Sequence, residues 1–280
     1  MSQSIVISHK DGQWNGDKIH NGASKIELGK YKELKVAVKH FDGKVNVNKV
    51  IRELRKHRHL RSSNSNIKNV ITFYGVVRKP NDRICLVMEY ARNGNLHEYL
   101  SRNLLDWKIK AGWIIDVSRG LLACHENDIA HLDMKAANIF DHNLTLKIAD
   151  FGFSYMKSGL DIGDIGYANR KSLQWVSPEY ISEDQKMKDY YKGQPDLSDI
   201  YSFGLVAWEI LTNGKEPYDG MDSNEIEEAK RSKRIDDLTD ELRERDTPGV
   251  LRKIVEKCCI YNPPDRIALE EIELLLSDFN

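Results

Sequence analysis

The first third of the chain consists of short apolar runs, rich in β-branched residues and separated by turn residues. Runs of this kind predict strands. They lie at residues 5–8, 35–39, 70–74 and 84–88. Between the second and third runs, residues 48–60 place apolar side chains at helical spacing. This part of the chain is therefore predicted to be β-rich with one main helix.

After Gly94 the pattern changes to the longer apolar spacing of helices. The predicted helices cover residues 105–126, 200–211, 251–259 and 269–276. The run 200–211 is apolar on all sides, which indicates a helix buried within the protein. A β-rich first third followed by a helical remainder predicts an α+β fold with two lobes, and the boundary is expected near residues 91–94.

Composition narrows the class of protein. The 280 residues are 40% hydrophobic and 30% charged, which is typical of a globular chain. The net charge of -1 gives no electrostatic argument for a nucleic-acid or membrane partner. No apolar run approaches the roughly 20 residues of a membrane span, and residues 1–4 do not begin a secretion signal. Four cysteines without metal-ligand spacing are expected to be reduced thiols in a cytoplasmic protein.

Two short runs carry the chemistry. The first, residues 131–138, has the sequence His-Leu-Asp-Met-Lys-Ala-Ala-Asn, and the second, residues 150–152, is Asp-Phe-Gly. Phosphoryl transfer needs a carboxylate to orient the acceptor hydroxyl and oxygen ligands to hold Mg²⁺ against the phosphates. Any single Asp or Asn is more often a helix cap or turn residue, but the joint order and spacing favour the chemical interpretation. The two runs resemble the catalytic loop and the DFG motif of eukaryotic protein kinases.

This resemblance implies roles for four polar residues. Asp133 is the expected catalytic base, which orients the acceptor hydroxyl. Asn138 and Asp150 are the expected ligands of Mg²⁺, which prefers hard oxygen donors. Lys135 resembles the lysine with which Ser/Thr-type kinases contact the transferred phosphate, so the expected acceptors are Ser and Thr hydroxyls.

A lysine and a glutamate are expected to complete the catalytic set. The strand 36–39, Val-Ala-Val-Lys, matches the Val-Ala-Ile-Lys motif, so Lys39 is expected to reach the α- and β-phosphates of ATP. Its natural partner on the following helix is Glu53, although residues 62–64 then read as a small insertion. A histidine, His57, stands where the family usually places an apolar residue of its internal hydrophobic spine. The rest of that spine would be Phe73, His131 and Phe151.

The nucleotide-binding loop departs from the family pattern. The sequence matches the expected Gly-x-Gly-x-x-Gly-x-Val motif only weakly. His20 and Ser24 stand in place of the outer glycines, while Gly22 and Ile26 remain. Fewer glycines should weaken the grip on the nucleotide without abolishing it. Met88 is the expected gatekeeper, with Glu89-Tyr90-Ala91 as the hinge whose backbone binds adenine. The full set of expected nucleotide-binding residues is Gly22, Ile26, Ala37, Lys39, Met88, Glu89 and Ala91.

Further motifs confirm the resemblance at the level of the fold. Residues 177–179 resemble the Ala-Pro-Glu end of the activation segment, and the resemblance pairs Glu179 with Arg266. Residues 199–204 resemble the start of the central helix, where Asp199 would bond the catalytic-loop backbone. The similarity covers roughly residues 20–278 and is greatest to the tyrosine-kinase-like group, near its receptor-interacting and mixed-lineage-kinase-like branches. It implies one kinase domain over residues 1–280, with an N-lobe to about 90, a hinge at about 89–94 and a C-lobe from about 95.

One position bears on regulation. The usual His-Arg-Asp is His-Leu-Asp here, which makes the chain a non-RD type, and Leu132 cannot bind a phosphate as the arginine does. Phosphorylation of the activation segment is therefore expected not to switch activity by that route. The candidate phosphorylation sites are Ser154, Tyr155, Ser158, Tyr167 and Ser172.

The sequence thus predicts an ATP- and Mg²⁺-dependent protein serine/threonine kinase in intracellular signalling, whose partners are a protein substrate and signalling proteins. A tyrosine or dual-specificity kinase is the first alternative, and Lys135 argues against it. The alternative from another class is a pseudokinase, a nucleotide-binding switch or scaffold. The thin glycine loop and His57 favour it, whereas the retained Lys39, Asp133 and the two metal ligands oppose it. Kinases of small molecules typically lack a Ser-Pro-Glu-like segment and are disfavoured.

Overall fold

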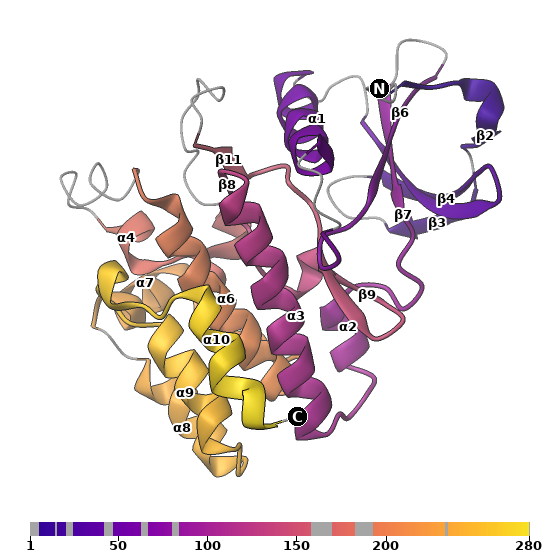
Figure 1. The fold of residues 1–280 in the computed structure, drawn as a ribbon. Coiled ribbons are helices and arrows are strands. Elements are labelled where there is room, and N and C mark those ends of the chain that lie inside the picture. Colours follow the sequence, from indigo (N-terminus) through magenta and orange to yellow (C-terminus); the bar gives the residue numbers. More distant parts are fainter. Residues whose placement is uncertain are drawn as a thin grey trace.

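The β-rich part of the molecule lies at one end and the helical part at the other (Figure 1). The computed structural model describes residues 6–14, 16–20, 25–41, 47–62, 67–79, 84–157, 170–182, 193–232 and 235–279. One sheet and α1 form the first part, and α2, α3 and the later helices form the second. The predicted α+β architecture is confirmed.

A curled, seven-stranded sheet dominates the β-rich part. Its strands follow the order β1-β6-β7-β5-β4-β2, and β3 pairs with β4. Their bounds are β1 Val6–Ile7, β2 Gly12–Gln13, β3 Lys18–His20, β4 Lys25–Tyr31, β5 Leu34–His40, β6 Phe73–Arg78 and β7 Ile84–Glu89. The central strand β7 is buried over four consecutive residues, consistent with its apolar sequence. Three of the four strand predictions hold to within a residue or two across the described residues.

The remaining strand, predicted at residues 70–74, begins later than its sequence predicts. β6 starts at Phe73, whereas the apolar run begins at Val70. The first residues of that run pair instead with β10 (Thr145–Ile148) of the helical part. The Ile71 N–H donates to the Ile148 carbonyl at 2.8 Å, and the Ile148 N–H donates to Asn69 at 2.9 Å. The run therefore changes partner after two residues and ties the two parts of the molecule together.

The first described residues form the two edge strands of the sheet. β1 pairs in parallel with β6, and after Ser8 and a 3-10 turn (His9–Asp11) β2 pairs with β4. The two outermost strands of the sheet order are therefore neighbours in the chain. Trp14 follows β2 and is buried, with its indole N–H donating to the His9 carbonyl at 2.8 Å. It packs in one apolar cluster with Val36, Val38, Cys85 and residues of the neighbouring strands.

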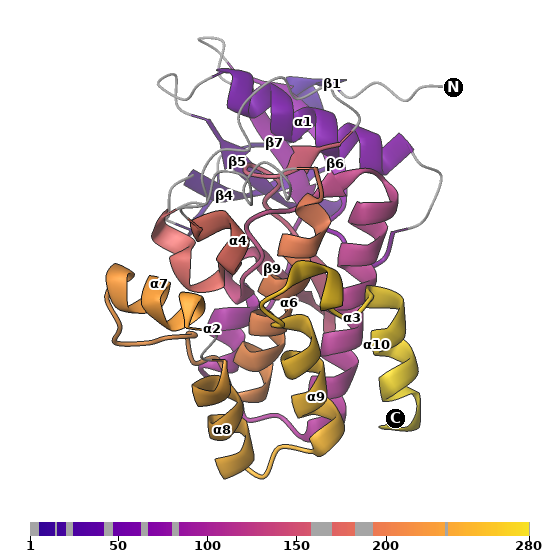
Figure 2. The same cartoon turned by 90° about the vertical axis from the view of Figure 1, so that its left-hand side faces the viewer.

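The helical part is built around α6 (Figure 2). The residues of α6 are buried almost without exception. Pro195 starts the helix, one turn before the apolar run, because proline suits the first helical position. α3 and α9 pack against α6. The α-helices of the described residues are α1 Val47–Ser62, α2 Leu96–Leu100, α3 Trp107–Glu126, α4 Pro178–Ile181, α6 Pro195–Leu211, α7 Ser223–Arg231, α8 Asp236–Glu244, α9 Gly249–Cys258 and α10 Leu269–Leu276.

Three further short strands occur within the described part of the chain. β8 (Ile129–Ala130) pairs with β11 (Tyr155–Met156), and β9 (Ile139–His142) pairs with β10. These two ribbons frame the loops that carry the candidate site. All four cysteines are buried and free of disulfide bonds, as the sequence predicts.

Candidate active site

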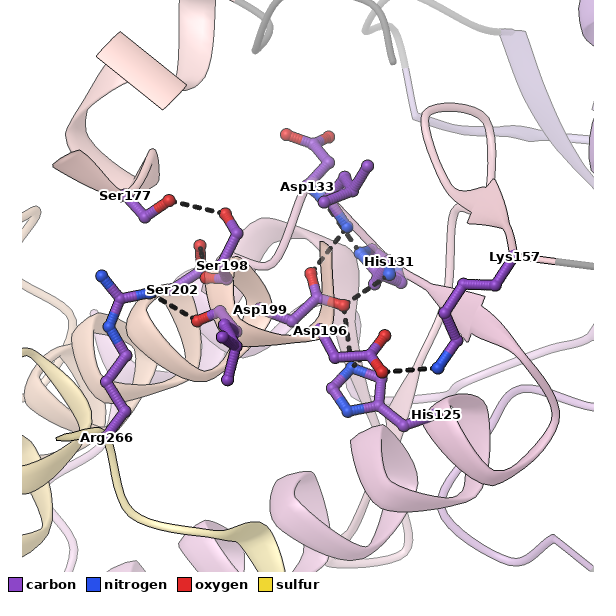
Figure 3. A network of polar contacts seen from close by, with 12 residues as sticks. His125, His131, Asp133, Lys157, Ser177, Asp196, Ser198, Asp199, Ser202 and Arg266 are labelled. Atoms are coloured by element: carbon purple, nitrogen blue, oxygen red, sulfur yellow. Dashed lines mark hydrogen bonds and ion pairs between the residues drawn. The ribbon is translucent and has the colours of Figure 1, made fainter. Parts of the chain in front are cut away.

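The loop 131–138 lies between β8 and β9, and Asp199 of α6 fixes its backbone. The buried Asp199 carboxylate accepts the N–H groups of His131 and Leu132 at 2.6 and 2.7 Å. His125 of α3 approaches the same carboxylate at 2.9 Å (Figure 3). Leu132 has a φ of 59°, a left-handed conformation that is unusual for a leucine. Two charge-assisted hydrogen bonds hold this turn, and the turn places Asp133.

The Asp133 carboxylate is buried between two polar neighbours. Asn138 donates its side-chain amide to the Asp133 carbonyl at 2.7 Å and to Oδ2 at 2.8 Å. Lys135 Nζ lies 3.3 Å from Oδ1 and donates to Ser172 Oγ at 2.7 Å. Oδ1 accepts no hydrogen bond from the described residues. Of the two carboxylate oxygens, Oδ1 is therefore the one without a hydrogen bond from the described residues, with the Lys135 ammonium beside it.

Lys39 joins α1 to the segment 150–152. Its ammonium lies 2.7 Å from Glu53 Oε1 and 2.9 Å from Asp150 Oδ1. Burial raises the pKa of Asp150, but the Lys39 ammonium outweighs it and holds that pKa at about 2. Asp150 has a φ of 62° and is thus a second strained residue at the site. The Asp150 carboxylate is therefore ionised at neutral pH, and so is Lys39, because its two acidic neighbours raise its pKa.

His57 completes a stack of rings between the two parts of the molecule. Its ring lies 4.9 Å from Phe73 and 5.1 Å from Phe151, which in turn lies 5.2 Å from His131. Burial and the Lys39 charge lower the pKa of His57 to about 3, so the ring is neutral. Its Nε2 has no hydrogen-bond partner among the described residues. The stack is continuous despite the polar member, at the expense of one unsatisfied nitrogen.

The expected adenine-binding residues lie on β4, β5, β7 and the stretch that follows β7. Met88 is opposite Ala37 in the sheet, and Ile26 is opposite Lys39. Ala91 follows the end of β7 and is buried. The side chain of Glu89, the first expected hinge residue, accepts hydrogen bonds from Thr72 and Lys147, and the expected hinge contact concerns its backbone. Gly22, Ser24 and the phosphorylation candidates Ser158 and Tyr167 lie outside the described residues.

A buried ion pair anchors the end of the segment that begins at Asp150. Arg266 donates to both oxygens of Glu179, at 2.7 and 2.8 Å, as the sequence predicts. Sequence reasoning missed a second anchor, Glu209 of α6. One of its oxygens accepts the Trp175 indole N–H at 2.7 Å and the Ala136 N–H at 3.1 Å. Burial raises the pKa of Glu209 to about 8, so this carboxyl group is protonated at neutral pH.

Three buried lysines were also missed. Lys110 of α3 donates to the carbonyl of Leu211 at 3.0 Å. Lys230 of α7 donates to the carbonyls of Leu173, Gln174 and Val176. Lys56 of α1 donates to the carbonyl of Ser154. The sequence contains only a weak indication that Lys56 is buried. It lies three residues after Glu53, a spacing that places both side chains on one helix face.

Comparison with known proteins agrees with this geometry. A family model for protein tyrosine and serine/threonine kinases matches residues 11–276. The chain therefore belongs to the protein tyrosine and serine/threonine kinase family.

Three relatives illustrate the similarity. A protein of Acanthamoeba polyphaga mimivirus whose name includes the words serine/threonine-protein kinase/receptor R826 is 29% identical over 94% of this chain and 16% of the relative. Serine/threonine-protein kinase STY46 of Arabidopsis thaliana is 33% identical over 60% of this chain and 26% of its own length. Mitogen-activated protein kinase kinase kinase dlk-1 of Caenorhabditis elegans is 35% identical over 59% and 16%, respectively.

These relatives are consistent with the tyrosine-kinase-like group that the motifs indicate. The chain spans between 16% and 26% of the length of these relatives. Within the described ranges, no helix combines the length and apolar character needed to cross a membrane.

Proposed function

We propose that this chain transfers the γ-phosphate of ATP to Ser and Thr hydroxyls of protein substrates. The observation that carries the proposal is the closed chain of ion pairs from Glu53 through Lys39 to Asp150. It joins α1, β5 and the Asp-Phe-Gly segment in one arrangement. Phosphoryl transfer depends mainly on positioning and on charge stabilisation, and this arrangement supplies both.

Each polar residue then has a task. Asp133 accepts a hydrogen bond from the acceptor hydroxyl at its unsatisfied Oδ1 and so orients the nucleophile. Lys135, adjacent to that oxygen, places positive charge where the transferred phosphate passes. Lys39 holds the α- and β-phosphates, and Glu53 fixes the lysine in place. Ile26, Ala37 and Met88 are proposed to enclose the adenine, and the backbone of residues 89–91 to bond it.

Asn138 and Asp150 suit a Mg²⁺ ion. Asn138 uses its amide nitrogen on Asp133, which leaves the amide oxygen for a metal. Asp150 stays ionised, because its pKa is about 2. A bound Mg²⁺ would neutralise phosphate charge at these oxygens.

A pseudokinase is the second candidate, and the glycine loop favours it. Only Gly22 of the three expected glycines is present in the sequence. The other argument for a pseudokinase is that a polar His57 would leave α1 loosely docked. The ring contacts of His57 with Phe73 and Phe151 argue against loose docking. On balance we favour the active enzyme.

The deciding experiment is transfer of labelled phosphate from Mg-ATP to the protein itself and to a generic substrate. Asp133→Asn is run beside it, and Asp106→Asn is the matched control, since Asp106 is exposed and Asn caps a helix equally well. Transfer that survives in the control and disappears in Asp133→Asn supports the kinase. No transfer from any form at high ATP overturns it in favour of the pseudokinase. Phosphoamino-acid analysis then separates Ser/Thr from Tyr acceptors.

We also propose that residues 1–280 form one kinase domain, with the lobes and hinge expected from the sequence. The four buried cysteines form no disulfide bond, which agrees with a reducing compartment, and we place the protein in the cytoplasm, in signalling.

A further inference from the structure

Lys56 is a buried lysine on a helix whose Arg55, Arg58 and Arg61 side chains are exposed. It is 1% exposed, whereas the neighbouring Arg55 and Arg58 are exposed. Lysine is among the residues least often buried, because its ammonium loses hydration. A buried lysine at this point of α1 therefore requires a specific partner.

One such partner is a backbone carbonyl just beyond the Asp-Phe-Gly segment. Lys56 Nζ donates to the carbonyl of Ser154, which is itself buried. The Ser154 N–H donates to the Phe151 carbonyl at 3.3 Å, which closes a turn. The next residue, Tyr155, pairs with Ala130, which directly precedes the catalytic loop. The contact thus connects α1 to the loop through a few residues of backbone.

Together with Glu53, this lysine binds α1 to both sides of the turn. Glu53 acts through Lys39 on Asp150, before the turn, and Lys56 acts on Ser154, after it. The two anchors lie three residues apart on one helix face. If α1 moved away from the sheet, both connections would break together.

Stability alone does not explain a buried lysine here. Burying an ammonium costs more free energy of hydration than a single hydrogen bond to a neutral carbonyl returns. A residue that is not favoured by stability is a candidate for a functional role.

We propose that Lys56 is a positioning residue, which holds the Asp-Phe-Gly turn against α1 in the arrangement needed for phosphoryl transfer. The inference rests on the proposed function. It also bears on the replacement of the usual arginine by Leu132. Leu132 cannot order the activation segment by binding a phosphate, whereas Lys56 supplies a cation that contacts the start of this segment. The anchoring is then built into the chain and needs no modification.

The test compares Lys56→Met with Arg58→Met, which removes an exposed cation from the same helix. For Lys56→Met we expect kcat to fall about 10- to 100-fold, a range typical of misplaced catalytic groups, with a smaller change in the KM for ATP. The melting temperature should stay level or rise. Amide exchange should become faster in residues 47–62 and 150–157 but not in α6. Arg58→Met should change none of these.

Two results would overturn the proposal. One is a kcat close to that of the unaltered protein together with unchanged exchange in residues 150–157. The other is a lower melting temperature with faster exchange throughout, which indicates a merely structural role. If the unaltered protein transfers no phosphate, the proposed function fails, and the exchange pattern still decides whether Lys56 holds the turn.

Discussion

The backbone N–H of Leu132 donates to the buried carboxylate of Asp199 at 2.7 Å, and Leu132 has a φ of 59°. A second N–H, from His131, reaches the same carboxylate. A strained backbone persists only where its surroundings hold it. Asp199, 67 residues further along the chain, therefore sets the local geometry in front of Asp133.

Asp199→Asn should reduce catalysis more than binding. An amide group cannot accept both N–H donors with the strength of a carboxylate, so the turn should relax and displace Asp133. We expect kcat to fall about 10- to 100-fold while the KM for ATP changes little. Steady-state kinetics measure this. Asp196→Asn, on the same helix and paired with Lys157, is the control. Equal losses in both variants would show that the effect is general to α6.

Removal of phosphate should leave activity intact, because Leu132 offers no cation to a phosphorylated segment. Phosphatase treatment and Tyr155→Phe should each keep kcat within about twofold. Ser154 and Ser172 are buried, so their hydroxyls are poorly placed for modification in this arrangement. The check is turnover before and after phosphatase treatment, with Leu132→Arg in parallel. Lost turnover on treatment, with Leu132→Arg no different from the unaltered protein, would contradict the prediction.

His57→Leu should stabilise the protein most in acid. In the unfolded chain a histidine takes up a proton below about pH 6.5, whereas His57 in the folded protein stays neutral until about pH 3. The unfolded state therefore binds more protons in this window, and stability falls as pH falls. The free energy of unfolding of the variant should gain about 2 kcal/mol on the unaltered protein between pH 7 and pH 5.

Urea unfolding at both pH values measures this gain. His9→Leu, at an exposed position, serves as control. A gap between His57→Leu and the unaltered protein that does not widen in acid would mean that His57 is protonated in the folded state.

Glu209→Gln should show the opposite dependence on pH. The folded protein keeps Glu209 protonated up to about pH 8, whereas the unfolded chain loses that proton near pH 4.5. The stabilising contribution is complete below pH 4.5 and is lost as pH rises through about 8. Between pH 6 and pH 8 the unaltered protein should lose on the order of 2–3 kcal/mol that the variant keeps.

Thermal or urea unfolding of both proteins at these pH values gives the comparison. Glu244→Gln, exposed on α8, is the control. Parallel pH profiles for Glu209→Gln and the unaltered protein would refute a protonated Glu209.

The sequence placed the polar residues of the site well because they occur in short runs with fixed spacing. Asp133, Lys135 and Asn138 lie within one loop, and the loop brings them together regardless of distant packing. The pairing of Lys39 with Glu53 needed only one strand and one helix. The roles of Glu209 and Lys230 were not predicted, because their partners are far away in the chain. These partners are Trp175 for Glu209 and backbone carbonyls in residues 173–176 for Lys230. Local sequence does not reveal whether such a side chain faces solvent or protein.

The helices α7 and α8 were missed for a related reason. Both are short and strongly charged, so neither has the continuous apolar face of α3 or α6. A local signal existed for α7: Asp222 and Glu225 form a capping box. The strand predicted from Val70 failed in part because two of its residues pair with β10, a tertiary choice that alternation cannot encode.

The arrangement of β1 and β2 has a practical consequence for anyone who shortens this protein. A version beginning at residue 14 would leave unpaired backbone groups on both β6 and β4 at once. Open edges of this kind recruit strands from other molecules, so the product should self-associate. Its failure in an assay would then reflect aggregation, and would say nothing about the chemistry of the loop at Asp133. A shortened version of this protein should therefore begin before Val6, so that both β1 and β2 are kept.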